Sequence, residues 1–150
     1  MPQSYTSLLY HIVFSTKDRF PFLAPEWRGR LYAYLGGILR ERGGDLLEIN
    51  GTNDHVHLLL RLHQEHTLAQ VVRDVKAASS GWIHREFPRL SHFAWQRGYG
   101  AFTVSASQLA RVRRYIQAQE EHHRRRTFQE EFIALLKAHG IEYDEQHLWG

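Results

Sequence analysis

Apolar and polar residues follow two repeating patterns along the chain, one typical of strands and one typical of helices. Residues 8–15 (LLYHIVFS) are rich in aromatic and β-branched side chains and predict a strand. The stretch from Pro25 to about Arg42 predicts a helix that Gly43 and Gly44 end, because apolar residues recur there every three or four positions. These apolar residues are Trp27, Leu31, Tyr34, Leu35 and Ile38.

Two strands and a helix are predicted in the middle of the chain. Residues 46–50 and 55–62 each predict a strand, and residues 51–54 (GTND) have the composition of a tight turn between them. A helix is predicted from Thr67 to about Phe87. It begins with a capping-box pattern, in which the N-cap threonine is followed three residues later by glutamine.

The C-terminal part predicts two short strands and two helices. Residues 93–96 and 102–104 predict strands on either side of a glycine-containing loop. Residues 105–123 and 127–139 predict helices that each open with a capping-box pattern, and Gly140 ends the second. The order β-α-β-β-α-β-β-α-α indicates a mainly antiparallel sheet with helices packed on one side. A ferredoxin-like α+β fold fits this order best.

The composition restricts the chemistry available to the chain. Its 150 residues are the usual length of one domain, and we expect residues 1–150 to form a single domain. It contains no cysteine, which excludes disulfides, thiolate catalysis and thiolate-bound zinc. Any metal site must therefore use histidine, carboxylate or amide ligands. No apolar run approaches the roughly 20 residues of a membrane span, so we expect a cytoplasmic protein that makes no membrane contact.

Charge is distributed unevenly along the chain. Residues 1–126 carry 18 lysines and arginines against 11 acidic residues, whereas residues 127–150 carry one lysine and five acidic residues. A basic body of this kind favours a polyanionic partner such as nucleic acid. An ordinary basic surface would have the same charge, so this observation alone does not identify the partner.

Two histidines share one face of the strand predicted at residues 55–62. Side chains alternate between the two faces of a strand, so His55 and His57 point away from an unbroken apolar face. We expect that apolar face, formed by Val56, Leu58, Leu60 and Leu62, to contact the core. Two imidazoles at positions i and i+2 of a rigid strand lie close enough to bind one divalent ion. Two histidines on the surface of a half-exposed strand would show the same spacing.

A tyrosine and a glutamine lie one turn apart on the helix predicted at residues 105–123. Tyr115 and Gln119 are four residues apart and therefore share a helix face. Tyr115 lies beside the edge of the apolar stripe of this helix, so its hydroxyl could face a site on the sheet, with the Gln119 amide oxygen as a third metal ligand. A metal that polarises a phosphate would help a phenol whose pKa is near 10 to act as a nucleophile. A tyrosine that only packs against the core would fit the same pattern.

Together these motifs resemble those of the HUH-superfamily single-tyrosine transposases of the smallest bacterial insertion sequences. "HUH" denotes two histidines separated by a hydrophobic residue, as in His55-Val56-His57. Residues 115–123 (YIQAQEEHH) match the tyrosine motif of this family. Residues 10–17 (YHIVFSTK), 95–102 (WQRGYGAF) and 140–144 (GIEYD) also match. The resemblance extends in order over nearly the whole chain, which makes it more specific than either motif alone.

The resemblance implies a mechanism and partners. A divalent ion, Mg²⁺ or Mn²⁺, would be held by His55, His57 and Gln119 and would bind the scissile phosphate of single-stranded DNA. Tyr115 would attack this phosphate and leave a 5′-phosphotyrosine and a free 3′-hydroxyl, which can later reseal strands. The resemblance also implies a homodimer that recognises DNA hairpins at the ends of the element. In such dimers the tyrosine helix of one subunit often meets the histidine pair of the other.

Arginines near the tyrosine are candidates for DNA contact. They could hold the phosphates on either side of the cut, and they are Arg111, Arg113, Arg114, Arg124, Arg125 and Arg126. For the last three, a solvated helix end is the alternative. Weaker candidates on the preceding helix are Arg73, Lys76 and Arg85. His122 and His123 adjoin the site in sequence and could assist proton transfer, although we do not expect an essential role for either.

Two other functions are compatible with the sequence. A catalytically idle ferredoxin-like module would bind nucleic acid without needing a metal, and its histidines and Tyr115 would be structural. A domesticated or relaxase-like nickase would keep the HUH chemistry without transposing. Relaxases are typically larger and often have a third metal-binding histidine, for which this chain shows no obvious motif.

Overall fold

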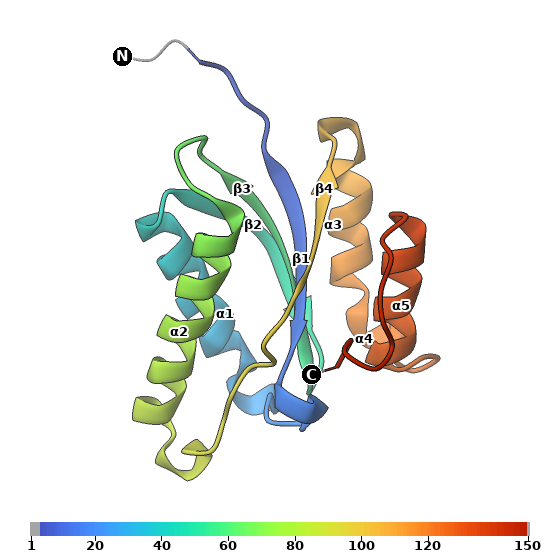
Figure 1. Ribbon diagram of the computed structural model, residues 1–150. Helices are drawn as coiled ribbons and strands as arrows, with labels where there is room; N and C mark the ends of the chain where they lie inside the picture. Colours follow the sequence, from blue (N-terminus) through green and yellow to red (C-terminus); the bar gives the residue numbers. More distant parts are fainter. Residues whose placement is uncertain (1–3, 150) are drawn as a thin grey trace.

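The computed structural model describes residues 4–149 and contains a four-stranded antiparallel sheet in the order β2-β3-β1-β4 (Figure 1). The strands are β1 (Leu9–Ser15), β2 (Gly44–Gly51), β3 (His55–Leu62) and β4 (Gly100–Val104). Helix α1 (Pro25–Glu41) connects β1 to β2, and helix α2 (Leu68–Glu86) connects β3 to β4. This β-α-β-β-α-β arrangement is ferredoxin-like, so the predicted fold class is confirmed.

The remaining elements are short helices and the C-terminal helices. Three 3₁₀ turns, η1 (Lys17–Arg19), η2 (Pro88–Leu90) and η3 (Ala106–Gln108), lie between the larger elements. After β4 come α3 (Leu109–Gln117), α4 (Gln119–His122) and α5 (Phe128–Ala138). Among the described residues, we find no helix with both the length and the apolar character needed to cross a membrane.

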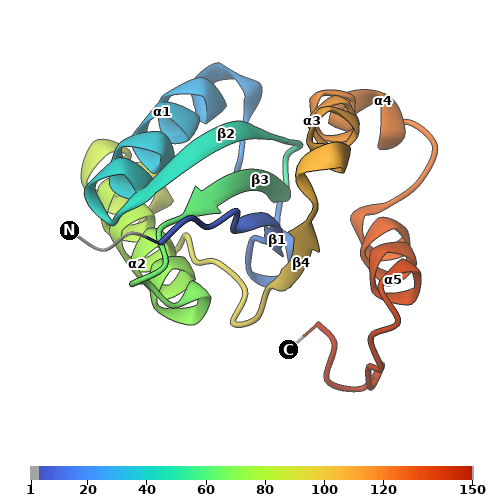
Figure 2. The same cartoon turned by 90° about the horizontal axis from the view of Figure 1, so that it is seen from above.

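Helices cover both faces of the sheet, as Figure 2 shows from above. Helices α1 and α2 pack on the face that Ile12, Phe14 and Leu58 form, and this is the larger core. The other face is also apolar. Phe102 and Val13 of this face contact α5, and Leu59 lies among buried residues that include Ile116 of α3. The expectation that all helices share one side is therefore wrong. An apolar second face must also be removed from water, and the C-terminal helices do this.

Strand β3 has the bounds and the facing that its sequence predicts. Val56, Leu58, Leu60 and Leu62 lie in the larger core, and the histidines point to the opposite face. That opposite face is not half-exposed, because His55 and His57 have no solvent-accessible surface. The C-terminal helices enclose them.

The predicted caps are confirmed at two of the three helix starts. The Thr67 hydroxyl accepts a hydrogen bond from the Gln70 backbone at the start of α2. Thr127 and Glu130 form a complete capping box at the start of α5. Ser105 does not cap a helix, and η3 takes the place of the first turn. Each working cap satisfies a backbone N–H that the helix itself leaves unpaired.

The helix predicted at residues 105–123 is broken at Ala118, which separates α3 from α4. The side chain of Asn50 on β2 explains the break. Its amide nitrogen donates to the carbonyl oxygens of Ile116 and Gln117, each at 3.1 Å. Because these carbonyls already have a partner, the helix loses no hydrogen bond by ending there.

The strand predicted at residues 93–96 does not form. The segment makes one isolated antiparallel bridge, between Thr16 and Trp95. Phe93 and Trp95 are nevertheless buried, and both Phe14 and Phe93 meet the Trp95 ring edge-on, with centroids 4.9 Å apart. The aromatic residues that suggested a strand therefore serve the core as an irregular segment.

Lys76 on α2 holds the loop that follows this segment. Its Nζ donates to the carbonyl oxygens of Gln96, Arg97 and Gly98 at 2.9, 3.3 and 2.7 Å. The ammonium group also lies 5.0 Å from the centroid of the Phe14 ring. One cation thus joins α2, β1 and the loop that leads to β4.

We expect Lys76→Met to lower the free energy of unfolding by about 1–3 kcal/mol, because three carbonyls lose a charged donor. Urea denaturation followed by circular dichroism would measure the change. The control is Arg73→Met, which removes an exposed cation from the same helix and should change stability by less than about 0.5 kcal/mol. Equal effects of the two substitutions would show that the carbonyl contacts of Lys76 contribute nothing.

Candidate active site

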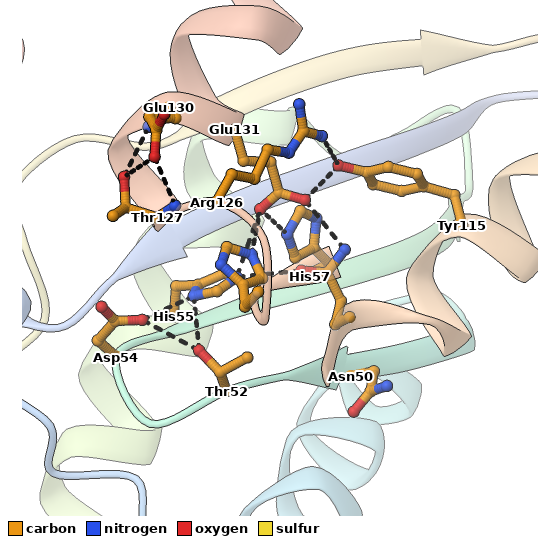
Figure 3. A network of polar contacts seen from close by, with 12 residues as sticks. Asn50, Thr52, Asp54, His55, His57, Tyr115, Arg126, Thr127, Glu130 and Glu131 are labelled. Carbon is orange, nitrogen blue, oxygen red and sulfur yellow. Dashed lines mark hydrogen bonds and ion pairs between the residues drawn. The ribbon is translucent and has the colours of Figure 1, made fainter. Parts of the chain in front are cut away.

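The two histidines of β3 lie at the centre of a buried polar network (Figure 3). Both are on the face of the sheet that α3 and α5 cover. In the sheet register His57 lies opposite Val13 of β1 and Asn50 of β2, and His55 lies opposite Ser15. Pairing on both sides fixes the backbone of β3, so the two imidazoles are held at a constant separation.

A glutamate of α5 joins these histidines to a third. Glu131 Oε1 lies 3.0 Å from Nε2 of His57, 3.5 Å from Nε2 of His55 and 2.9 Å from Nε2 of His123. Glu131 has no solvent-accessible surface. A carboxylate is buried in this way only where several partners compensate for the loss of water.

The predicted nucleophile and the predicted third ligand meet at the other oxygen of this carboxylate. The Tyr115 hydroxyl donates a short hydrogen bond to Glu131 Oε2, and the Gln119 amide nitrogen donates to the same atom at 3.0 Å. Gln119 Oε1 lies 3.1 Å from His55 Nε2. The structure therefore brings together Tyr115, Gln119 and both histidines within a single chain.

A second layer of polar groups orients the two imidazoles of β3. Nδ1 of His55 lies 2.8 Å from the Asp54 carboxylate and 3.1 Å from the Thr52 hydroxyl. Nδ1 of His57 lies 2.8 Å from Nε2 of His11. Both rings therefore use Nδ1 for outer contacts and direct Nε2 to the common centre, the arrangement found around metal-binding histidines.

Burial and neighbouring charges shift the pKa values of these histidines in different directions. Burial lowers the pKa of His57 to about 4, and burial together with the adjacent His57 lowers that of His11 to about 3. Burial acts in the same sense on His55. Its hydrogen bonds with Asp54 and Glu131 outweigh the effect of burial, however, and raise the pKa of His55 to about 9. At neutral pH the first two rings are therefore neutral, and available as ligands or acceptors.

Glu131 and Tyr115 have opposite protonation states. Burial favours protonated Glu131, but its hydrogen bonds with His123, His55 and His57 outweigh burial and hold its pKa well below the usual range. Burial and the Glu131 charge raise the pKa of Tyr115 above its usual value. The phenol is therefore protonated at neutral pH and faces an ionised carboxylate that can accept its proton.

The donor atoms can hold a cation. One ligand atom each from His55, His57, His123 and Glu131 lies within 4.8 Å of the others, and three of these residues are fully buried. Imidazole nitrogen and carboxylate oxygen suit divalent ions of intermediate hardness. The amide oxygen of Gln119 adds a further donor beside His55.

A cavity adjoins the predicted nucleophile. Its volume is about 700 Å³, and its wall includes residues of β4, α3 and the C-terminal part of α5. Tyr115 and His11 are among its lining residues, Arg111 contributes positive charge, and His139 stacks on Phe102 with ring centroids 4.3 Å apart. Cavities of this size hold ligands as large as a nucleotide.

The predicted DNA-binding arginines occupy different places. An Arg126 nitrogen lies 3.4 Å from the Tyr115 hydroxyl, so this arginine belongs to the site itself. Arg124 and Arg125 are exposed and line a shallow hollow beside Asp54 and His123. Arg111 and Arg114 are also exposed.

Arg113 has structural contacts with β2. It donates to the Leu47 carbonyl at 3.1 Å and lies 3.8 Å from the Glu48 carboxylate on β2. The weaker candidates also have different environments. Lys76 is hydrogen-bonded to the loop described above, whereas Arg73 and Arg85 are exposed. Direct contact of any of these residues with DNA stays a prediction.

Sequence reasoning missed the carboxylate that connects the site. Glu131 lies within the apolar stripe of α5, three residues after Phe128 and one before Phe132. A charged residue in such a stripe is the signal that could have found it, because a lone charge is seldom buried. His11 gave no comparable signal, since its role depends on which strands pair. His123 was considered for proton transfer but not as a metal ligand.

Comparison with known proteins identifies the family. The sequence model described as "Transposase IS200 like" matches residues 4–119. The ISDra2 transposase TnpA of Deinococcus radiodurans is 28% identical over 119 residues, which cover 76% of this chain and 85% of the relative. The transposase for insertion sequence element IS200 of Salmonella typhimurium is 28% identical over 117 residues, which cover 75% of this chain and 76% of the relative.

Solved structures agree with the sequence relatives. A crystal structure from Deinococcus radiodurans R1, assigned as a transposase, has a TM-score of 0.66 and 30% identity, and the match covers 79% of this chain and 95% of that chain. A REP-associated tyrosine transposase bound to a REP hairpin has a TM-score of 0.61 and covers 82% of this chain and 73% of that chain. Its identity of 14% makes this a likeness of fold alone.

The matched segment contains all four strands, the histidine pair and Tyr115. By class, the fold and the matched sequence are those of a transposase, an enzyme that acts on DNA. The chain belongs to the IS200-like transposase family. His123 and Glu131 lie beyond the matched segment.

Proposed function

We propose that this protein cuts and rejoins single-stranded DNA through a covalent 5′-phosphotyrosine on Tyr115. The observation that supports this most directly is that the predicted nucleophile and the predicted metal-binding histidines contact the same buried carboxylate. The Tyr115 hydroxyl and the imidazoles of His55 and His57 all contact Glu131 of the same chain. A phenol, a proton acceptor and a set of metal-binding donors are thus within reach of one phosphate.

The chain's own groups can supply the nucleophile and move its proton during the bond exchange at phosphorus. Tyr115 Oη attacks the phosphorus while its proton passes to Glu131 Oε2. The bond to the 3′-oxygen breaks, that oxygen leaves with the electron pair of the broken bond, and the proton that Glu131 received passes to it to give a 3′-hydroxyl. Arg126, beside the Tyr115 hydroxyl, is placed to stabilise charge on the phosphate oxygens. One phosphate ester bond is exchanged for another, that of the phosphotyrosine. A 3′-hydroxyl can therefore reverse the reaction and join strands without a nucleotide cofactor.

A divalent ion belongs to this proposal. The resemblance assigns His55, His57 and Gln119 as ligands of Mg²⁺ or Mn²⁺. Nε2 of both histidines faces Glu131 Oε1, and the Gln119 amide oxygen lies 3.1 Å from His55 Nε2. Such an ion, when bound, makes the scissile phosphate more electrophilic. The two β3 imidazoles are oriented for this role by Asp54 and His11.

We further propose that residues 1–150 act as one transposase domain on single-stranded DNA that carries hairpins. A structural neighbour is described as bound to a REP hairpin, and its fold is shared. The homodimer implied by the resemblance remains part of the proposal. Since Tyr115 and His57 meet within one chain, a site of this kind does not need the tyrosine of a second subunit.

The proposal is tested by trapping the covalent intermediate. The protein is incubated with labelled single-stranded hairpin oligonucleotides, including the DNA that flanks its own gene, in the presence of Mg²⁺ or Mn²⁺. A denaturing gel then resolves protein joined to DNA. We expect an adduct that requires the metal ion.

The same gel separates the competing functions. DNA binding by gel shift without any adduct, even with the flanking DNA, would favour the idle binding module and contradict our proposal. An adduct without transfer of the 3′-hydroxyl to a second strand would favour the domesticated nickase. Adduct and joined strands together would support the transposase.

We expect Arg124→Gln with Arg125→Gln to weaken single-stranded DNA binding and to flatten its salt dependence. Each phosphate that an arginine no longer neutralises should reduce the slope of log K against log salt by about 0.7, or about 1.4 for both. Fluorescence anisotropy at several salt concentrations would measure this slope. The control is Arg40→Gln with Arg42→Gln, the same charge change at the other end of the fold. An unchanged slope in the Arg124→Gln, Arg125→Gln variant would show that these arginines form a solvated helix end and do not neutralise DNA phosphates.

A further inference from the structure

The environment of Glu131 Oε1 is unusual for a carboxylate oxygen. Three imidazole nitrogens surround it, at 3.0 Å for His57, 3.5 Å for His55 and 2.9 Å for His123. One carboxylate oxygen offers about two lone-pair directions, and the hydrogen bonds with His57 and His123 use both. The other oxygen already accepts from Tyr115 and Gln119. The His55 nitrogen, at 3.5 Å, therefore has no good hydrogen bond to this oxygen although it faces the same centre, and a cation shared by the four groups would account for this convergence.

The distances between these donor atoms are close to those between the ligand atoms of one bound metal ion. For bonds of about 2.0–2.2 Å, the donors of a tetrahedral site lie about 3.3–3.6 Å from one another. The contacts of Glu131 Oε1, at 2.9–3.5 Å, are close to this range, and all four donor atoms lie within 4.8 Å of one another. Small movements of side chains would complete the set.

Two independent features agree with ligation by the histidines. First, Nδ1 of His55 and of His57 is held by an outer partner, which leaves Nε2 of each for the centre. Second, the His123 ring lies beside that of His55, tilted by 58° with centroids 4.4 Å apart, and its Nε2 lies 2.9 Å from the same carboxylate oxygen. A network that served only to fold the protein would not need Nε2 atoms of three imidazoles at one centre.

We propose that the C-terminal segment completes the metal site, with His123 and Glu131 as ligands beside His55 and His57, and that this site prefers Mn²⁺, Co²⁺ or Zn²⁺ to Mg²⁺. This inference rests on the metal-dependent function proposed above and adds two ligands that lie beyond the matched residues 4–119. Three imidazoles and one carboxylate suit transition metals, whereas Mg²⁺ demands octahedral oxygen ligands. Gln119 then acts as a neighbouring donor rather than as the sole third ligand.

Metal affinity of the intact protein tests this inference without reference to activity. Competition with a chromophoric chelator gives the Kd for Mn²⁺, Co²⁺ and Mg²⁺, and the metal-induced rise in Tm gives a second measure. We expect the wild-type protein to bind Co²⁺ and Mn²⁺ on the order of 100-fold more tightly than Mg²⁺. We expect Glu131→Gln and His123→Ala each to weaken this binding by about 100-fold or more.

Matched controls distinguish ligand loss from a general effect. Glu142→Gln and His63→Ala change exposed residues of the same types and should leave the Kd unchanged. If Glu131→Gln fails to fold, as judged by circular dichroism without metal, His123→Ala decides the question, because His123 is in a turn and is not fully buried.

The outcomes also separate this inference from the proposed function. Wild-type affinity in Glu131→Gln and His123→Ala, with loss of binding in His57→Ala, would overturn the inference and leave the family's metal site intact. Equal affinity for Mg²⁺ and Mn²⁺ would overturn the proposed preference. If the wild-type protein bound none of these ions, both the inference and the metal-dependent function would fail.

Discussion

Tyr115→Phe is expected to remove the covalent protein–DNA adduct, with a fall in the rate of adduct formation of about 10⁴-fold or more. The substitution deletes only the attacking oxygen. The phenyl ring can stay where it lies, close to the rings of His11, His57 and His122. Glu131 loses one hydrogen bond but keeps its contacts with three histidines and Gln119. Stability should therefore fall by only about 1–2 kcal/mol. Denaturing gels and thermal unfolding, run in parallel, would measure both quantities.

The control for this experiment is Tyr99→Phe. Tyr99 is partly exposed in the loop before β4 and lies against Lys76, and its hydroxyl forms none of the hydrogen bonds described for Glu131. The Tyr99→Phe variant should form the adduct at the wild-type rate. Binding of the hairpin DNA by Tyr115→Phe should also remain, because we expect arginines rather than Tyr115 to make most of the phosphate contacts. An adduct that persists in Tyr115→Phe would assign the nucleophile to another side chain and would refute the proposed mechanism.

The second large effect is expected for His57→Ala, which should abolish DNA cleavage while hairpin binding is largely retained. The imidazole is removed from the centre of the site, so an ion is held less tightly and the phosphate is less activated. A loss of about 10³-fold or more in cleavage rate corresponds to the several kcal/mol that metal activation supplies. Single-turnover cleavage and gel-shift titration would measure the two activities separately.

Folding must be controlled in this experiment, because His57 is buried and contacts Glu131 at 3.0 Å. Removal of one partner of a buried charge can cost about 3–5 kcal/mol. His57→Gln keeps a polar side chain and should be less destabilised, yet equally deficient in cleavage. His63→Ala, in the exposed turn after β3, should behave like the wild type. If His57→Ala or His57→Gln cut DNA at the wild-type rate, His57 would not be a metal ligand.

Local patterns predicted most of the fold correctly. Strand β3 was found with its correct bounds and its two faces because each of its apolar positions alternates with a residue that points the other way. Thr67 and Thr127 were identified as caps because a cap requires only a side chain and a backbone N–H three residues apart. Such features depend on neighbours in sequence.

The errors have a common physical cause. The break at Ala118 depends on Asn50, which lies 66 residues before the Ile116 carbonyl that it binds, and the irregular segment around Trp95 depends on packing against Phe14. The placement of helices on both faces depends on how apolar the second face of the sheet is. None of these contacts is visible from the local period of the sequence.

The candidate site was predicted in part for the same reason. His55 and His57 are two residues apart, and Tyr115 and Gln119 are four apart, so local geometry pairs them. That the two pairs meet came from the family resemblance. Glu131 could not be placed in this way, because its connection to Tyr115 spans a turn and a change of helix.

The hydrogen bonds of the Asn50 amide affect how the parts of the candidate site move relative to one another. Asn50 pairs in register with His57 and also holds the last carbonyls of α3, directly after Tyr115. The strand that bears the imidazoles and the helix that bears the phenol are thus coupled through the Asn50 side chain and should fluctuate together. Helix α5 reaches the same centre through side chains, chiefly Glu131. In the proposed reaction, the Asn50 side chain would thus help to keep the phenol and the imidazoles aligned, whereas Glu131 approaches them from a different helix.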